Sequence, residues 1–212
     1  MVIADSQAGI GAPAFSTGAP TVGVLGLQGG VREHADLVES LDAHAVQIRK
    51  PADLVGPDGA RVDALILPGG ESSVIDRLAR MFGLDAPIRE QVEAGLPTLG
   101  TCAGLILLAK RLENPAPGQQ TLGILDITVN RNAFGPQVES AEATLGTEWG
   151  EIRAAFIRAP QIVSVDGAET RVMAHYGDAI VGVERGKVLG ASFHPELTRD
   201  TTLHQRLLSF VG

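Results

Sequence analysis

Short apolar runs alternate with amphipathic patterns through the first hundred residues of the chain. The runs of aliphatic and β-branched residues that predict buried strands are 21–27, 45–48, 63–67 and 97–100. The segments with apolar residues at helical spacing are 31–41, 74–81 and 85–94. This alternation with short loops predicts an α/β fold in three layers, with a mostly parallel central sheet and helices on both faces.

The pattern changes after Gly123 to strand-like runs separated by Gly, Asp and Asn turns. The expected strands are 124–130, 138–145, 152–157, 162–165, 172–173, 180–184 and 188–193. They are expected to extend the same sheet, partly in antiparallel pairing, and 198–210 is predicted to be a closing helix. We therefore expect one domain over 21–212.

Residues 1–20 are rich in Gly, Ala, Ser and Pro and show no periodicity, so a disordered leader is expected there. They lack the basic start and apolar centre of a signal peptide, and no apolar run approaches the roughly 20 residues that span a membrane. A single cysteine excludes an internal disulfide and suits the cytoplasm. A formal charge of −8 argues against a general nucleic-acid binder.

The segment around the only cysteine carries the strongest chemical signal. Gly100-Thr101-Cys102-Ala103-Gly104 follows a predicted strand and precedes an apolar helical segment. Glycines on both sides of the cysteine are typical of a nucleophile elbow, in which a sharp strand-to-helix turn leaves no room for side chains. The helix start also favours a thiolate. The alternative is a small buried core cysteine, which does not require the glycines.

A base and its orienting group are found at the end of a later strand. His194 ends the run that begins at Val188, and Glu196 follows after Pro195. A cysteine nucleophile needs a base within hydrogen-bond reach and a group that fixes its tautomer, and this pair fits both roles. A histidine like His194, taken alone, is more often a loop or core residue than a catalytic one. Ordinary structural roles are expected for His34, His44, His175 and His204.

The turn Gly69-Gly70-Glu71-Ser72 ends the third predicted strand. Its glycines let the backbone N–H of Gly70 face a developing oxyanion, with the Ala103 N–H on the other side. Ser72 or Ser73 is expected to cap the next helix. The alternatives are a phosphate-binding loop or a plain turn, and the absence of a lysine excludes a Walker loop. No Cys/His cluster has metal-ligand spacing, so neither a metal nor another cofactor is expected.

These motifs carry a family resemblance. In this order, Pro-Gly-Gly-Glu-Ser (68–72), Gly-Thr-Cys-Ala-Gly (100–104) and Phe-His-Pro-Glu (193–196) resemble the class I, triad-type glutamine amidotransferases. The segments that further resemble the glutaminase subunits of pyridoxal 5′-phosphate synthase are 25–29, 31–34, 130–135 and 156–160. The resemblance runs from Val22 to about Phe210.

The resemblance implies a role for each matching residue. Cys102 would be the nucleophile, His194 the acid/base and Glu196 the orienting carboxylate. The residues implied to line a glutamine pocket are Gly70, Glu71, Ser72, Arg131, Ile157 and Arg158. The implied reaction is glutamine hydrolysis through a thioester, with the ammonia passed to a (β/α)₈-barrel synthase subunit that makes pyridoxal 5′-phosphate. Gln28 would face that partner.

Three other functions stay open on the sequence. The chain could be the glutaminase of another amidotransferase, feeding an imidazole or purine precursor. It could be a non-catalytic scaffold of the same fold, although the intact Cys102, His194 and Glu196 argue against this. The third and weakest alternative is a cysteine peptidase.

Overall fold

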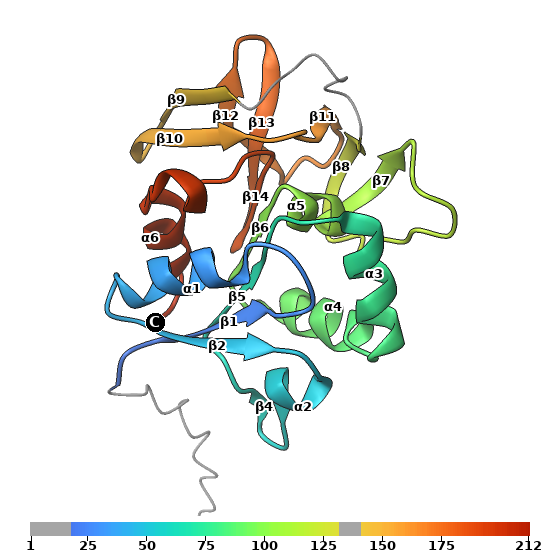
Figure 1. Cartoon of the computed structure of the whole chain (residues 1–212), viewed down its shortest axis with the longest axis vertical. Coiled ribbons are helices and arrows are strands. Elements are labelled where there is room, and N and C mark those ends of the chain that lie inside the picture. Colours follow the sequence, from blue (N-terminus) through green and yellow to red (C-terminus); the bar gives the residue numbers. More distant parts are fainter. Residues whose placement is uncertain (1–17, 132–140) are drawn as a thin grey trace, which may run out of the picture.

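A computed structural model describes residues 18–131 and 141–212, which build a ten-stranded mixed sheet (Figure 1). Its strands in the first half are β1 (Thr21–Leu25), β2 (His44–Ile48), β5 (Ala64–Leu67) and β6 (Thr98–Thr101). The later strands are β7 (Ala109–Glu113), β8 (Leu125–Asn130), β11 (Gln161–Val165), β12 (Arg171–Tyr176), β13 (Ala179–Arg185) and β14 (Val188–Ala191). The order is β2-β1-β5-β6-β14-β13-β11-β8-β7, with β12 paired to β13.

The first five strands of that order are all parallel. Four of them come from the first half of the chain, where the sequence predicts a parallel sheet, and β14 joins them from the second half. The antiparallel strands β11, β12 and β13 extend the sheet beyond them. Side chains alternate between the two faces along each strand. On β5, Leu65 and Leu67 belong to one apolar core, whereas Ala64 and Ile66 belong to the other.

Helices cover both faces of the sheet, so the predicted three-layer α/β architecture is confirmed (Figure 1). The helices are α1 (Val31–Glu39), α2 (Pro51–Leu54), α3 (Ser72–Met81), α4 (Asp85–Glu93), α5 (Ala103–Leu108) and α6 (Thr202–Leu208), and η1 (Glu196–Thr198) is a 3₁₀ turn. α3, α4 and α5 pack in the core that contains Leu65, through residues such as Ile75 and Ile88. α1 and α6 pack in the opposite core through Val38 and Leu203.

The hairpin of β9 (Ala141–Thr147) and β10 (Gly150–Phe156) corrects one prediction. It does not extend the main sheet but forms its own two-stranded antiparallel sheet. Ile152, Ala154 and Phe156 on one face of β10 are buried in the same core as α1 and α6. The hairpin therefore packs over the face of the main sheet, because an alternating pattern fixes which side chains are buried but not which strand they pair with.

Several element boundaries also differ from the prediction. The apolar segment after Cys102 is helical only to Leu108, and 109–113 forms the unpredicted strand β7, parallel to β8. The connection before residue 61 contains α2 and a small hairpin of β3 (Val55–Gly56) and β4 (Gly59–Ala60). The N-cap of α3 is Glu71, whose carboxylate accepts from the Ser73 N–H, so neither expected serine caps that helix.

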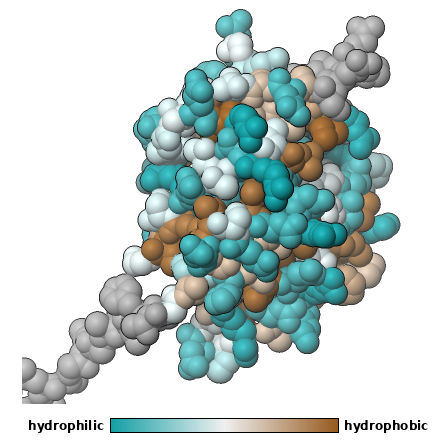
Figure 2. Space-filling view, turned by 60° about the vertical axis from the view of Figure 1, so that its left-hand side comes forward, coloured by the Kyte–Doolittle hydropathy of each residue, from teal (hydrophilic) through white to brown (hydrophobic). Residues whose placement is uncertain are grey.

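The remaining predictions concern the ends and the surface. Residues 1–17 of the expected leader and 132–140 lie outside the described residues. Within the described ranges, no helix combines the length and the apolar character needed to cross a membrane. Figure 2 shows the side on which α1, α6 and the β9–β10 hairpin lie, where hydrophilic side chains cover most of the surface.

We predict that Gly104→Ala destabilises the fold, because α5 approaches β5 too closely for a side chain at this position. A Cβ on Gly104 would lie 1.9 Å from the Leu67 carbonyl oxygen, which is backbone and cannot rotate away. Overpacking of this kind costs about 3 kcal/mol of unfolding free energy. Urea denaturation of the two chains measures the difference.

Gly146→Ala is the matched control, because no atom lies within 4 Å of its added Cβ. It should leave the urea midpoint unchanged or raise it slightly. Equal midpoints for Gly104→Ala and Gly146→Ala would contradict the close approach of α5 to β5.

Candidate active site

Cys102 lies at the junction of β6 and α5 in a backbone conformation that a side chain rarely adopts. Its φ is 48° and its ψ is −100°. Its N–H donates to the Ala191 carbonyl at 2.8 Å, and its carbonyl accepts from Ile106 N–H at 3.2 Å, within α5. This strained strand-to-helix turn has the geometry of a nucleophile elbow. The Cys102 residue is 8% exposed and lines a pocket.

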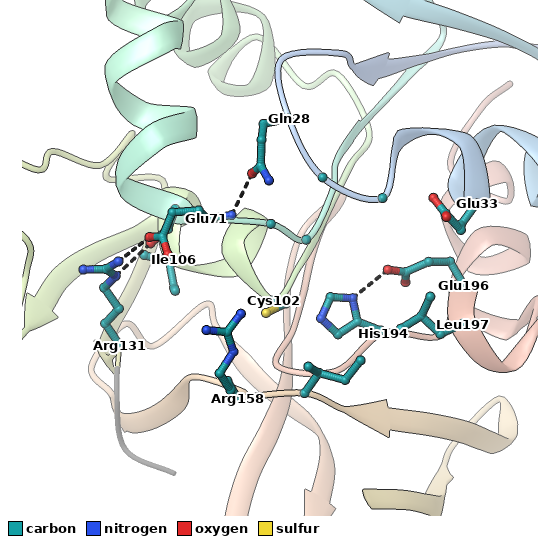
Figure 3. A pocket seen from close by; sticks show the side chains of 16 residues that line it. Gln28, Glu33, Glu71, Cys102, Ile106, Arg131, Arg158, His194, Glu196 and Leu197 are labelled. Carbon is teal, nitrogen blue, oxygen red and sulfur yellow. Dashed lines mark hydrogen bonds and ion pairs between the residues drawn. The ribbon is translucent and has the colours of Figure 1, made fainter. Parts of the chain in front are cut away.

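The histidine reaches Cys102 because β6 and β14 are parallel neighbours. Thr101 is in register with Ala191, so Cys102 and His194 follow the same pair of strand ends. The His194 N–H donates to the Ala155 carbonyl at 2.8 Å, which fixes the histidine backbone against β10. The His194 Nδ1–H donates to Glu196 Oε1 at 2.7 Å, and Figure 3 shows the imidazole beside the Cys102 sulfur.

The charges of the three groups depend on one another. Burial lowers the pKa of His194, but its hydrogen bonds with Cys102 and Glu196 and the charges of both groups outweigh burial and raise the pKa to about 10. His194 is therefore an imidazolium at neutral pH. It lies between a sulfur that can ionise and a carboxylate, which is the charge arrangement of an activated cysteine nucleophile.

Two buried histidines lie behind the carboxylate. His34 Nε2 is 3.5 Å from Glu196 Oε2 and 3.0 Å from Thr101 Oγ1, and His34 Nδ1 is 2.9 Å from His204 Nε2. Burial lowers the pKa of His34 well below its usual value and that of His204 to about 4, so both rings are neutral at neutral pH. The sequence analysis expected no special role for this pair.

The turn after β5, residues 69–72, lies beside His194 in the same pocket. A Cβ on Gly69 would lie 2.2 Å from His194 Cε1, so only glycine lets the turn approach the imidazole. Gln28 Oε1 accepts from the Glu71 N–H at 2.7 Å, and a Cβ on Gly70 would lie 2.4 Å from that same oxygen. Gln28 thus lines the pocket and holds the turn. Its contact with a partner stays a prediction.

Arg131 and Glu71 form a charged wall of the pocket beside this turn (Figure 3). The Arg131 guanidinium forms an ion pair with Glu71, and its Nε donates to Ser72 Oγ at 3.1 Å. Burial raises the pKa of Glu71, but the charge of Arg131 and the hydrogen bonds from Ser73 and Arg131 together outweigh burial, so the net shift of the pKa is downward. The wall therefore presents one carboxylate and one guanidinium side by side.

The strand β10 contributes the remaining predicted residues. Ile157 and Arg158 follow its last residue, and Arg158 has a φ of 44°. Figure 3 shows the Arg158 guanidinium reaching toward Cys102. Ile157 is 37% exposed at the pocket rim.

One pocket of about 440 Å³ collects nearly every residue that the sequence indicated. The predicted residues that line it are Gln28, Gly70, Glu71, Ser72, Cys102, Arg131, Ile157, Arg158, His194 and Glu196. Ala103 is the first residue of α5 and is fully buried, so only its backbone can serve the site. Gly69 of the predicted glycine turn lines it too, and the further lining residues without a predicted role are Gly29, Gly30, Glu33, Ile106 and Leu197.

Signals for some of the missed residues were present. His34 lies three residues after Val31 and four before Val38, which places it on the inner face of α1. Ile106 lies four residues after Cys102, one helical turn along α5. No comparable spacing identifies Leu197. In the part of the chain that the structure describes, no group of His, Cys, Asp or Glu could hold a metal ion.

Comparison with known proteins finds one matching family along nearly the whole chain. Residues 24–211 match the SNO glutamine amidotransferase family. The chain is 50% identical over 190 residues to the pyridoxal 5′-phosphate synthase subunit PdxT of Corynebacterium diphtheriae, covering 90% of this chain and 99% of that protein. The PdxT of Streptomyces griseus is 48% identical, with 91% and 96% covered.

Solved structures share the fold. A structure described as a glutamine amidotransferase has a TM-score of 0.83 and 46% identity, covering 90% of this chain and 98% of that one. The structure of PurLQS from Thermotoga maritima has a TM-score of 0.68 at 19% identity, covering 92% and 100%. At that identity the second likeness concerns the fold alone.

We predict that the free energy of unfolding falls as the pH decreases from about 6.5 to about 4. Unfolded histidine binds a proton near pH 6.5, whereas burial lowers the pKa of folded His204 to about 4. The unfolded state binds more protons in this window, so stability increases with pH and His204 alone accounts for about 3 kcal/mol by pH 4. The raised pKa of His194 acts between about pH 6.5 and 10, outside this window.

Urea denaturation between pH 7 and pH 4 measures this dependence. His204→Phe should weaken it without abolishing it, because His34 stays buried. His175→Phe, at an exposed position, is the matched control. An unchanged pH dependence in His204→Phe would refute the assignment.

Proposed function

This chain belongs to the SNO glutamine amidotransferase family, and we propose that it hydrolyses glutamine at the Cys102 pocket and delivers the ammonia to a pyridoxal 5′-phosphate synthase. The observation that carries the site assignment is one pocket in which the His194 imidazole lies beside the Cys102 sulfur and donates to Glu196. A nucleophile, an acid/base and an orienting carboxylate are the groups that acyl transfer requires.

The first half of the reaction makes a thioester. The Cys102 thiolate attacks the carboxamide carbon of glutamine, and a C–S bond forms as the carbonyl becomes an oxyanion. The His194 imidazolium gives its proton to the amide nitrogen, the C–N bond breaks, and ammonia leaves. The raised pKa of His194, about 10, ensures that this proton is present at neutral pH.

The second half releases glutamate. His194, now neutral, takes a proton from water while the water oxygen attacks the thioester carbon. The C–S bond breaks, which restores the Cys102 thiolate and the imidazolium. We assign the oxyanion to the backbone N–H groups of Gly70 and Ala103, on either side of the nucleophile. Glu196 stabilises the imidazolium in the stages where it is present and orients the neutral ring in between, through its 2.7 Å hydrogen bond with His194 Nδ1.

The charged wall suits the amino-acid end of glutamine. Its α-carboxylate would be held by Arg131 and Arg158, because guanidinium groups bind carboxylates with paired hydrogen bonds. Its α-ammonium would be held by Glu71, whose lowered pKa keeps it ionised. Ser72 and Ile157 complete this side of the pocket.

The partner proposal rests on the relatives named pyridoxal 5′-phosphate synthase subunit, at 45–50% identity. Ammonia released into water would be protonated and lost, so the product must pass directly to a second active site. We propose that the receiving subunit is a (β/α)₈ barrel and that the rim of the pocket, including Gln28, faces it. We place the reaction in the cytoplasm, where a reducing environment keeps Cys102 a thiol.

Two alternatives are distinguished by one measurement. A glutaminase that feeds an imidazole or purine precursor would be activated by a different synthase subunit. A scaffold would leave glutamine unchanged with any partner. Glutamate release by the full chain, measured with its cognate pyridoxal 5′-phosphate synthase subunit and with a synthase subunit that takes an imidazole or purine precursor, separates all three.

We predict that Cys102→Ala lowers glutaminase activity by more than about 10³-fold in the presence of the synthase subunit, because the thioester cannot form. Glutamate release under saturating glutamine measures the loss. Co-elution with the synthase subunit on gel filtration should be unchanged, which shows that the variant still folds and binds. Glutamate release at the wild-type rate by Cys102→Ala would end the proposal.

We predict that Arg131→Met raises the KM for glutamine by about 10-fold to 100-fold, because a charge-assisted hydrogen bond is worth about 1.5–3 kcal/mol. The kcat should change less than KM, since Arg131 holds the end of glutamine that does not react. Lys50→Met, at the N-cap of α2, is the charge-matched control. A KM equal to that of Lys50→Met would remove Arg131 from the binding site.

A further inference from the structure

The carboxylate of Glu196 has a second set of neighbours that the proposed mechanism does not use. Its side chain is 1% exposed, and Oε1 is engaged by His194. Among the described residues, Oε2 has no partner at hydrogen-bond geometry, although His34 Nε2 lies 3.5 Å from it. His34 comes from α1 and has no exposed surface. Burial of a carboxylate oxygen without a hydrogen-bond donor raises the free energy of the folded state. The position of the proton on His34 therefore decides whether Oε2 faces a donor.

The distances fit two arrangements of the neutral histidine pair. In the first, His204 Nε2–H donates to His34 Nδ1, and His34 Nε2–H points to Glu196 Oε2 and Thr101 Oγ1. In the second, His34 Nδ1–H donates to His204 Nε2, and the bare His34 Nε2 faces the carboxylate oxygen. The second arrangement sets two electron-rich atoms against each other in a buried space and leaves Oε2 without a donor.

The first arrangement therefore has the lower energy. We propose that His34, held in its Nε2–H tautomer by His204, is a positioning residue that orients Glu196 toward His194. This inference rests on the proposed glutaminase function only where activity is the readout.

The neutrality of the pair is what makes it suitable. A cation at this position would compete with the His194 imidazolium for the charge of Glu196. A neutral N–H donor instead fixes the rotation of the carboxylate and leaves its charge directed at His194. Glu196 lies on a short 3₁₀ turn, η1, so a contact from α1 adds a constraint from a separate element.

Two isosteric substitutions separate the two nitrogens of His34. His34→Gln places an amide N–H₂ near the position of Nε2 and keeps the donor to Glu196. His34→Asn places its amide oxygen near Nδ1, where it can accept from His204 Nε2–H, and leaves no donor near Glu196. We expect His34→Asn to lower kcat for glutamine hydrolysis in the complex with the synthase subunit by about 10-fold to 100-fold with little change in KM.

His34→Gln should restore most of that loss, which a merely structural role would not predict. Equal kcat values for the two variants, or a loss in KM alone, would overturn the proposal. If the wild-type chain hydrolyses no glutamine with its partner, the proposed function fails instead, and the tautomer still tests the positioning role.

The tautomer of His34 can be measured by NMR spectroscopy, without an activity assay. A long-range ¹H–¹⁵N spectrum of the histidine-labelled wild-type chain reports which nitrogen of His34 carries the proton. Protonated Nε2 with bare Nδ1 is the expected result, and His34→Asn identifies the signals by their absence. Protonated Nδ1 would overturn the proposal, and His34→Gln identifies the same signals if His34→Asn does not fold.

Discussion

The pairing of β6 with β14 is the constraint on which the site depends. These strands are adjacent and parallel, and the register places Thr101 opposite Ala191. The Cys102 N–H continues that pairing by donating to the Ala191 carbonyl. A sulfur and an imidazole from positions 92 residues apart therefore meet because two strand ends meet. Gly104 permits this arrangement, since α5 must start directly against β5.

The histidines of the site differ in protonation state because each ring has different neighbours. His194 gains a proton from its position between Cys102 and Glu196, and its pKa rises to about 10. His34 and His204 lie behind Glu196 and are neutral, because burial lowers the pKa of both rings. The same residue type thus serves as a cation and as a neutral donor within one network, according to what each ring faces.

Sequence patterns predicted the parallel half of the sheet and the residues around Cys102, His194 and the Gly69–Ser72 turn. These features depend on local signals, namely strand-to-helix turns and glycines. The β9–β10 hairpin could not be placed in the same way, because alternation does not reveal the pairing partner. Strand β7 was hidden by the apolar run of α5. Arg131 and Arg158 showed no pattern of their own, and only the family resemblance indicated them.

The isolated bridge between Ala155 and His194 gives the β9–β10 hairpin a mechanical significance. The same strand continues into Ile157 and Arg158, so the backbone that is hydrogen-bonded to His194 also carries one wall of the pocket. A displacement of the hairpin would therefore move the His194 imidazole and that wall together. The orientation of His194 and the position of Ile157 and Arg158 are thereby coupled through one strand rather than adjusted separately.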